Sequence, residues 1–226
     1  MIFTSCLCMK LLKYPRPSCR TEPLLYDKRP RKKTACPCMG GRVNFASCVC
    51  ISGPHVLDVR QSAATVSSYL SIMEVSCVFY RLAPYQRHKT GRLIKSPKFY
   101  FGDAGLACYL AGTENISDDP LKGAMVETYV AQNIVGILDA TWPQANLFFW
   151  NIQGRHEVDF IIEAGNKCVA IEVKAAARWE KNDLAGLRTF IAATPHCVAA
   201  ILAYNGPTAV NPGGKLWAIP LSLLLS

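Results

Sequence analysis

The sequence predicts an α/β domain with a mixed central sheet flanked by helices, preceded by a small winged-helix-like segment. Half of the 226 residues are hydrophobic and 18% are charged, so the chain can bury a core. Residues 124–138 carry an amphipathic helical pattern, three β-type segments follow between residues 146 and 175, and residues 197–204 are an unbroken apolar run. The expected order of helix, three strands, helix and strand is typical of a sheet covered by helices.

Residues 1–42 hold most of the positive charge. They contain ten Lys and Arg residues and two acids, which leaves 15 Lys and Arg against 14 Asp and Glu in residues 43–226. The overall charge of +9 therefore says little about the folded part. We expect residues 1–42 to be a disordered or non-native basic leader. The alternative is that residues 28–33 form a basic arm that binds phosphates.

Cysteine and hydropathy patterns favour a cytoplasmic protein that does not enter the membrane. Seven of the eleven cysteines lie in the first fifty residues, and three of their pairs have C-x-C spacing, which does not match the usual zinc pattern. The four later cysteines stand singly among apolar neighbours, as buried reduced thiols do. No run reaches the ~20 apolar residues that a membrane helix needs.

Residues 43–97 are expected to form the winged-helix-like linker. Apolar residues recur at i, i+3, i+4 and i+7 in residues 63–73, which predicts a helix with Ser62 as its N-cap. A β-rich stretch follows at residues 75–82. Residues 86–98 are a basic loop, which is either a solvated connector or a rim that contacts phosphates.

Residues 98–226 are expected to form the main domain. Its first strand, KFYF, runs into a helix that Asp103 can cap. Gly154 suits a hairpin turn between two later strands. Further helices are predicted at residues 124–138 and 183–193, and further strands at residues 146–152, 157–163, 167–175, 197–204 and 216–220.

Charged residues interrupt two of these apolar strands. Side chains alternate along a strand, so Glu172 and Lys174 should project on the same side of their strand. Asp159 lies among apolar neighbours on the preceding strand. Charges on central strands are costly unless they are paired or bound to a metal. A hard divalent cation, Mg²⁺ or Mn²⁺, between Asp159 and Glu172 would account for both acids.

Two further side chains could complete this site. Lys174 would orient or help deprotonate an attacking water and would offset charge on a phosphate. Glu127, in the helix before the strands, could reach the same ion. The predicted metal ligands are therefore Asp159, Glu172 and Glu127, and Lys174 joins them as a catalytic residue. Taken singly, an E-x-K sequence on a strand is common by chance, and Glu127 alone would be an ordinary acid on the surface of a helix. The prediction therefore depends on the combination of Glu127, Asp159 and Glu172-x-Lys174.

The spacing of Glu127, Asp159 and Glu172-x-Lys174 resembles that of the PD-(D/E)XK nuclease superfamily of restriction enzymes and Holliday-junction resolvases. From about Thr65 onward the chain also resembles the C-terminal domain of uncharacterised bacterial and archaeal AAA-type ATPases. The stretches that carry this resemblance are TVSSYLSIMEVSCVFYRLAPY, RLIKSPKFYFGDAGLACYL, GAMVETYV, FFWNIQGRHEVDFII and IEVK. It implies a linker similar to a winged helix, followed by a nuclease-like fold.

The chain departs from that family in three respects. Family members normally begin with an ATPase domain, yet no G-x-x-x-x-G-K-[ST] motif occurs here, and residues 1–42 resemble nothing in the family. We therefore expect no ATPase domain in this chain. Asn151 stands where a basic residue is usual, which leaves Arg155 and His156 as the nearest basic groups.

The leading hypothesis is a Mg²⁺-dependent phosphodiesterase that acts on DNA. Its candidate nucleic-acid contacts are Arg92, Lys95, Lys98, Arg155 and His156. The alternative is a catalytically silent nuclease-like module that binds DNA or a protein, as the regulatory part of a truncated AAA ATPase; a degraded gene fragment is a third possibility. The near-neutral charge after residue 42 favours the silent module, whereas the intact Asp, Glu and Lys set favours catalysis.

Overall fold

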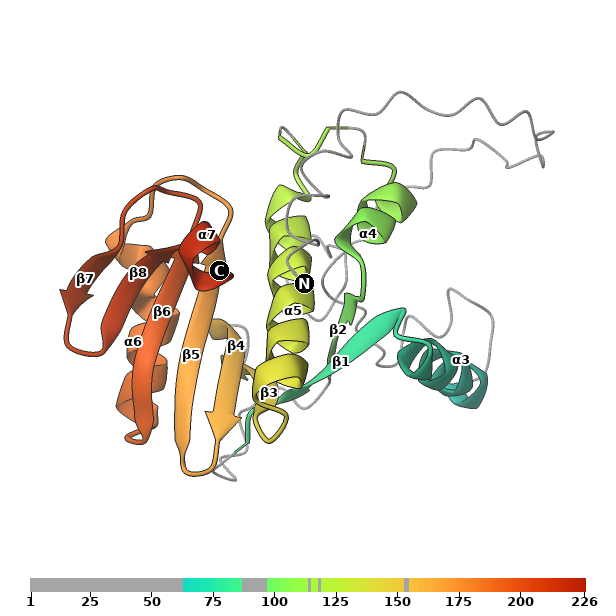
Figure 1. Ribbon diagram of the computed structural model, residues 1–226, viewed down its shortest axis with the longest axis horizontal. Helices are drawn as coiled ribbons and strands as arrows, with labels where there is room; N and C mark the ends of the chain where they lie inside the picture. Colours follow the sequence, from blue (N-terminus) through green and yellow to red (C-terminus); the bar gives the residue numbers. More distant parts are fainter. Residues whose placement is uncertain (1–62, 87–96, 114, 118, 153–154) are drawn as a thin grey trace. The chain divides into compact units, whose positions relative to one another are not determined.

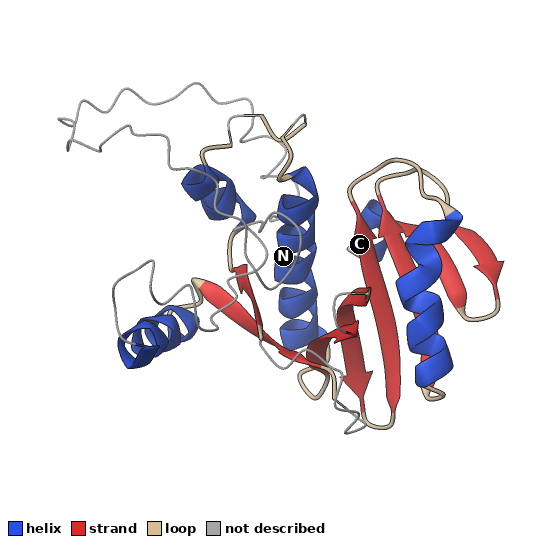
Figure 2. Ribbon diagram, turned by 180° about the vertical axis from the view of Figure 1, so that it is seen from behind, coloured by secondary structure: helices blue, strands red, loops and turns tan. Residues whose placement is uncertain are grey.

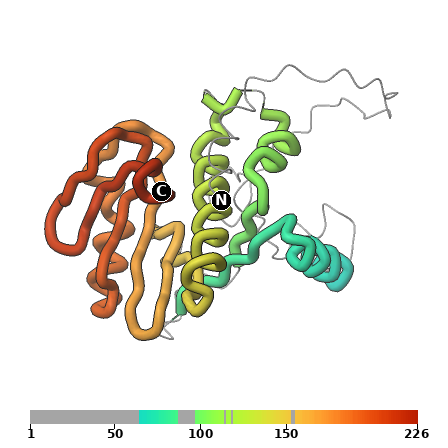
Figure 3. Tube along the Cα trace, in the orientation of Figure 1, coloured from blue at the N-terminus to red at the C-terminus, as the bar shows by residue number. Residues whose placement is uncertain are grey.

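The structure is a computed structural model that describes residues 63–86, 97–113, 115–117, 119–152 and 155–226. It confirms a mixed α/β architecture of one sheet with flanking helices (Figures 1 and 3). The strands are β1 (Phe79–Pro84), β2 (Lys98–Phe101), β3 (Asn146–Ile152), β4 (His156–Ala164), β5 (Lys167–Lys174), β6 (Cys197–Tyr204), β7 (Val210–Gly213) and β8 (Leu216–Pro220). The helical segments are α3 (Ala63–Val75), α4 (Ala104–Ala111), α5 (Lys122–Thr141), the 3-10 turn η1 (Lys181–Leu184), α6 (Ala185–Ala193) and α7 (Leu221–Leu224).

The sheet has the strand order β2-β1-β3-β4-β5-β6-β8-β7. Strands β3, β4 and β5 are antiparallel neighbours, and the β4–β5 turn contains Gly165, whose φ of 61° lies in the left-handed region that glycine tolerates. Strand β6 lies parallel to both β5 and β8, so its two edges are paired. The segment of η1 and α6 makes the crossover that the parallel β5–β6 pair requires.

Two hydrophobic cores lie on opposite faces of the sheet. On one face, α6 packs Leu187 and Phe190 against buried residues of β4, β5 and β6. On the other face, α5 packs Val130 and Ile134 against Phe160 and its neighbours, and α7 adds partly buried leucines. Figure 2 shows α6 in front of the sheet, on the face that is turned away in Figure 1. Helices α5 and α6 therefore enclose the central strands from both sides.

Helix α4 begins where the sequence predicts, at its cap Asp103. Oδ1 of Asp103 accepts a hydrogen bond of 2.5 Å from the N–H of Leu106. We expect Asp103→Ala to lower the free energy of unfolding by about 1 kcal/mol, because a helix N–H loses its acceptor. Asp103→Asn keeps an acceptor and should lose less. Urea denaturation measures both variants, and equal losses would contradict the capping role.

The structure departs from the expected elements in a few places. Helix α5 is longer at both ends than residues 124–138. The sequence predicts neither strand β7 nor helix α7. Strand β7 contains Pro212 and Gly213, which are depleted in strands but tolerated at a sheet edge. Strand β1, assigned to the linker by the sequence, pairs with both β2 and β3. Residues 1–42 and most of the loop at residues 86–98 lie outside the described residues.

Among the described helices, none combines the length and the hydrophobicity that a membrane-spanning segment requires.

Candidate acidic site

Asp159 lies at an irregularity of β4. The β3–β4 register shifts by one residue beside Phe149, so that Asp159 and Phe160 both lie opposite it. Such a bulge re-aims a side chain. Oδ2 of Asp159 accepts a hydrogen bond of 2.9 Å from the N–H of Val173 on β5, and Oδ1 lies 3.9 Å from Nζ of Lys98 on β2. Only 8% of Asp159 is exposed, so its carboxylate is fixed in the interior.

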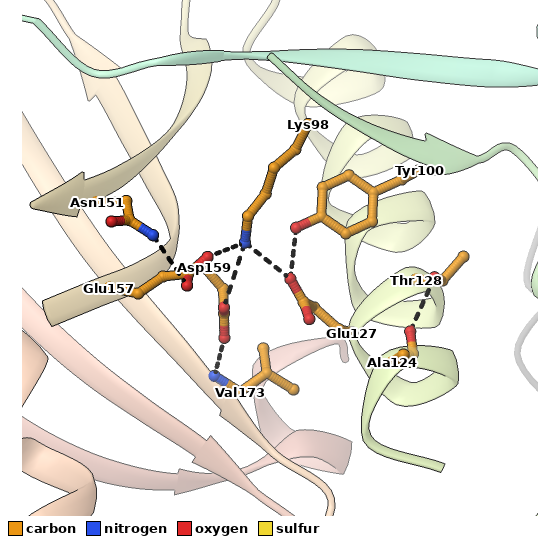
Figure 4. A network of polar contacts seen from close by, with 9 residues as sticks. All are labelled: Lys98, Tyr100, Ala124, Glu127, Thr128, Asn151, Glu157, Asp159 and Val173. Atoms are coloured by element: carbon orange, nitrogen blue, oxygen red, sulfur yellow. Dashed lines mark hydrogen bonds and ion pairs between the residues drawn. The ribbon is translucent and has the colours of Figure 1, made fainter. Parts of the chain in front are cut away.

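Lys98 joins Asp159 to two other carboxylates. Its Nζ lies 3.4 Å from Oε1 of Glu127 on α5 and forms an ion pair with Oε1 of Glu157 on β4 (Figure 4). Tyr100, two residues along β2, donates a hydrogen bond of 2.5 Å to the same oxygen of Glu127. We call Glu127, Glu157 and Asp159 the acidic cluster, and Lys98 is the cation at its centre.

Asp159 and Lys98 are held away from water. Burial raises the pKa of Asp159 well above its ordinary value, and the carboxylates of Glu127 and Glu172 raise it further, against the opposing effect of Lys98. Burial alone would lower the pKa of Lys98, but Glu127 and the other nearby groups outweigh it and raise that pKa well above its ordinary value. Lys98 therefore stays charged and is the resident cation of the cluster.

Glu172 and Lys174 lie on the side of β5 that faces α6. Cys168 and Ala170, at alternate positions of the same strand, belong to the core under α6. Nζ of Lys174 lies 3.2 Å from Oδ1 of Asp183 in η1. Burial raises the pKa of Glu172 to about 8, although Lys174 opposes that shift. Oε2 of Glu172 is buried and has no hydrogen-bond partner within the part of the chain that the structure describes.

The structure brings some of the predicted ligands together and leaves others apart. Glu127 and Asp159 share contact with Lys98, and Glu172 is near enough for its charge to raise the pKa of Asp159. Lys174 makes its ion pair with Asp183. Among the described residues, no three His, Cys, Asp or Glu side chains are grouped closely enough to hold a metal ion. An ammonium stands where the carboxylates meet.

The predicted nucleic-acid contacts are scattered. Arg92 and Lys95 lie outside the described residues. Arg155 is exposed next to β4, and His156 is the half-buried first residue of that strand. Lys98 is 9% exposed, and the groups it contacts are carboxylates. Contact of these residues with a nucleic acid stays a prediction.

Two family models match successive parts of the chain. Residues 122–224 match a domain of unknown function (DUF4143), and residues 52–117 match another domain of unknown function (DUF8612). The uncharacterized proteins Mb2031c of Mycobacterium bovis and Rv2008c of Mycobacterium tuberculosis are each 30% identical to this chain over 121 residues. Those residues make up 52% of this chain and 26% of each relative, so the chain spans about a quarter of the length of the curated relatives it matches.

The acidic cluster draws on both matched segments. Lys98 and Tyr100 lie in the DUF8612 segment, whereas Glu127, Glu157 and Asp159 lie in the DUF4143 segment. The parallel pairing of β1 with β3 joins the two segments in one sheet. The ammonium of Lys98 and the hydroxyl of Tyr100 therefore come from the DUF8612 segment, whereas the three acids that they contact come from the DUF4143 segment.

Sequence patterns did not predict Lys98, Tyr100 and Glu157 as partners of the predicted acids. A signal was present, because Lys98 and Tyr100 alternate in KFYF, and Glu157 and Asp159 alternate in EVD. Each pair occupies alternate positions of one strand. The sequence does not show how the strands pair. Strand β2 pairs with β1, β1 pairs with β3 and β3 pairs with β4, and this arrangement brings β2 and β4 toward helix α5.

Proposed function

We propose that residues 98–226 form a nuclease-like domain of the PD-(D/E)XK type, preceded by a winged-helix-like linker, and that it acts on DNA as a Mg²⁺-dependent phosphodiesterase. Acids from α5 and β4 meet around a positive charge inside the domain, and this observation carries the proposal. Buried carboxylates destabilise a fold unless they are compensated, and such groups gather at functional sites. DUF4143 domains are commonly associated with AAA-type ATPases, which agrees with the resemblance seen in the sequence.

The donor chemistry suits a hard divalent cation. Asp159, Glu172 and Glu127 would hold Mg²⁺ or Mn²⁺ through carboxylate oxygens, the ligands that these ions prefer. The buried Oε2 of Glu172, which lacks a hydrogen-bond partner among the described residues, favours a ligand there. When bound, the ion would supply Lewis acidity and lower the pKa of a bound water.

The basic groups near the acids would serve the water and the DNA. Lys174 would orient the attacking water and stabilise charge on the scissile phosphate, for which its ammonium would turn from Asp183 toward the substrate. Arg155 and His156 would contact the DNA backbone at the start of β4. Such contacts position the duplex and carry no sequence preference of their own.

A second candidate is the catalytically silent module that binds DNA or a protein. The contacts of Lys98 favour it, because an ammonium already neutralises Glu127 and Asp159 as a metal ion would. The near-neutral charge of residues 43–226 also favours it, since DNA enzymes usually carry a basic surface.

Cleavage of supercoiled plasmid by the full-length protein in Mg²⁺ or Mn²⁺ distinguishes the two candidates. We expect Asp159→Asn and Glu172→Gln each to reduce cleavage by at least about 100-fold, because each removes a charged ligand of the ion. Asp139→Asn, which neutralises an exposed acid of α5, is the matched control and should cleave like the wild type. Plasmid binding without any cleavage by the wild type would support the silent module. Cleavage that survives both substitutions would remove these residues from the site.

A further inference from the structure

Lys98 has the surroundings of a bound cation. Its Nζ makes ion pairs with Glu127, Glu157 and Asp159, which come from a helix and a strand that are distant in the sequence. The side chain is 11% exposed, and its ammonium lies 5.3 Å from the centre of the Phe149 ring. A buried lysine with three acidic neighbours and an aromatic ring beside it is held by the fold, unlike a surface lysine that meets acids transiently.

We propose that the ammonium of Lys98 competes with the divalent ion for the carboxylates of Glu127 and Asp159, so that the ion binds only when Lys98 has left. This rests on the proposed function, because Glu127 and Asp159 are two of the three ligands assigned to that ion. The two cations need the same oxygens. A divalent ion takes carboxylate oxygens at about 2.1 Å, and an ammonium in contact with those oxygens would then lie beside it as a like charge.

The acids are positioned without a metal, which is what such a competition requires. Tyr100 donates to Oε1 of Glu127, Asn151 donates to Oε2 of Glu157 at 3.1 Å, and the N–H of Val173 donates to Asp159 (Figure 4). Each carboxylate thus keeps a hydrogen-bond donor that does not depend on Lys98. The side chain of Lys98 has four flexible methylenes and can withdraw while these donors stay in place.

Metal binding by Lys98→Gln tests the competition. Binding of Mn²⁺ to the full-length protein is measured by calorimetry, and melting temperature is measured in chelator and in Mn²⁺. We expect Lys98→Gln to bind Mn²⁺ at least about tenfold more tightly than the wild type, to melt at a lower temperature in chelator, and to gain more from Mn²⁺. Lys167→Gln removes an exposed lysine of β5 and should match the wild type in all three measurements.

A second measurement uses the unaltered protein, in case Lys98→Gln does not fold. Acetylation of lysines, followed by mass spectrometry, should show Lys98 protected in chelator and more reactive once Mn²⁺ saturates the site, while Lys167 does not change. Equal or weaker Mn²⁺ binding by folded Lys98→Gln, or labelling of Lys98 that Mn²⁺ leaves unchanged, would overturn the competition.

The two proposals fail separately. Tighter Mn²⁺ binding by Lys98→Gln without DNA cleavage by either protein would leave the competition standing and remove the nuclease function. DNA cleavage by the wild type, with no gain in Mn²⁺ affinity for Lys98→Gln, would leave the function standing and remove the competition. Absence of Mn²⁺ binding in both proteins would remove both.

Discussion

Replacing Glu172 by glutamine should raise the free energy of unfolding near pH 9 by up to about 4 kcal/mol and change it little near pH 4, in the presence of chelator. Burial raises the pKa of this carboxyl group from 4.5 to about 8. Between those two values the native protein holds a proton that the unfolded chain has released, so native stability falls as the pH rises. Glutamine has no such proton to lose, and its amide can occupy the same space.

Urea denaturation between about pH 4 and pH 9 measures this effect. Asp159 retains its own raised pKa, so the variant should keep part of the wild-type loss of stability with rising pH. Asp139→Asn neutralises an exposed acid and should reproduce the wild-type curve. If Glu172→Gln and the wild type lose stability in parallel up to pH 9, Glu172 is ionised in the native state and its raised pKa is contradicted.

Gly186→Ala should lower the free energy of unfolding by about 3 kcal/mol, which corresponds to roughly 6–12 °C in melting temperature for a chain of this size. Gly186 lies in α6, and a Cβ built on it would be 2.2 Å from the backbone oxygen of Glu157. The obstacle is main chain of a central strand, so α6 or β4 must move. Because Glu157 is an ion-pair partner of Lys98, that movement would also disturb the acidic cluster.

Gly136→Ala is the matched control for this substitution. Gly136 lies within α5, and nothing is found within 4 Å of a Cβ built there. Alanine should therefore stabilise α5 by about 0.5–1 kcal/mol, as it does in open helix positions. Thermal denaturation followed by circular dichroism compares the two variants. A loss for Gly186→Ala no larger than about 0.5 kcal/mol would show that α6 does not approach β4 so closely.

The strands that form the middle of the sheet could be predicted because their side-chain patterns are strong. Strands β3, β6 and β8 begin and end at the predicted residues. The edge strand β7 could not be predicted, because its sequence VNPG is typical of a turn and only its pairing with β8 makes it a strand. Local sequence patterns therefore predict the strands that are packed on both faces of the sheet, whereas the edge strand forms through its tertiary contacts.

The acids of the site were predictable as unusual residues, but their partners were not. Asp159 stands out in the sequence because its neighbours are apolar, and the structure shows that it is buried. The direction of the Asp159 side chain is set by a β-bulge, in which β4 has one more residue than the paired segment of β3. The alternation of polar and apolar residues in the sequence does not reveal this extra residue. The sequence places Lys98 at the end of a basic loop and makes it a candidate contact for a nucleic acid. The ring of Phe149 and the acids around it determine its environment instead.

The central position of Lys98 also has a consequence for the order of folding. The nearest acid of the cluster, Glu127, is 29 residues away along the chain, and among the described strands β2 joins the sheet through its pairing with β1. Until β2 docks, α5 and β4 would bring carboxylates together with no counter-charge, and their repulsion would oppose closure. We therefore expect β2 to pair with the sheet before α5 docks on β4, or at the same time. The segment that contains β1 and β2 would then fold together with the segment that contains α5 and β4, in a single cooperative event.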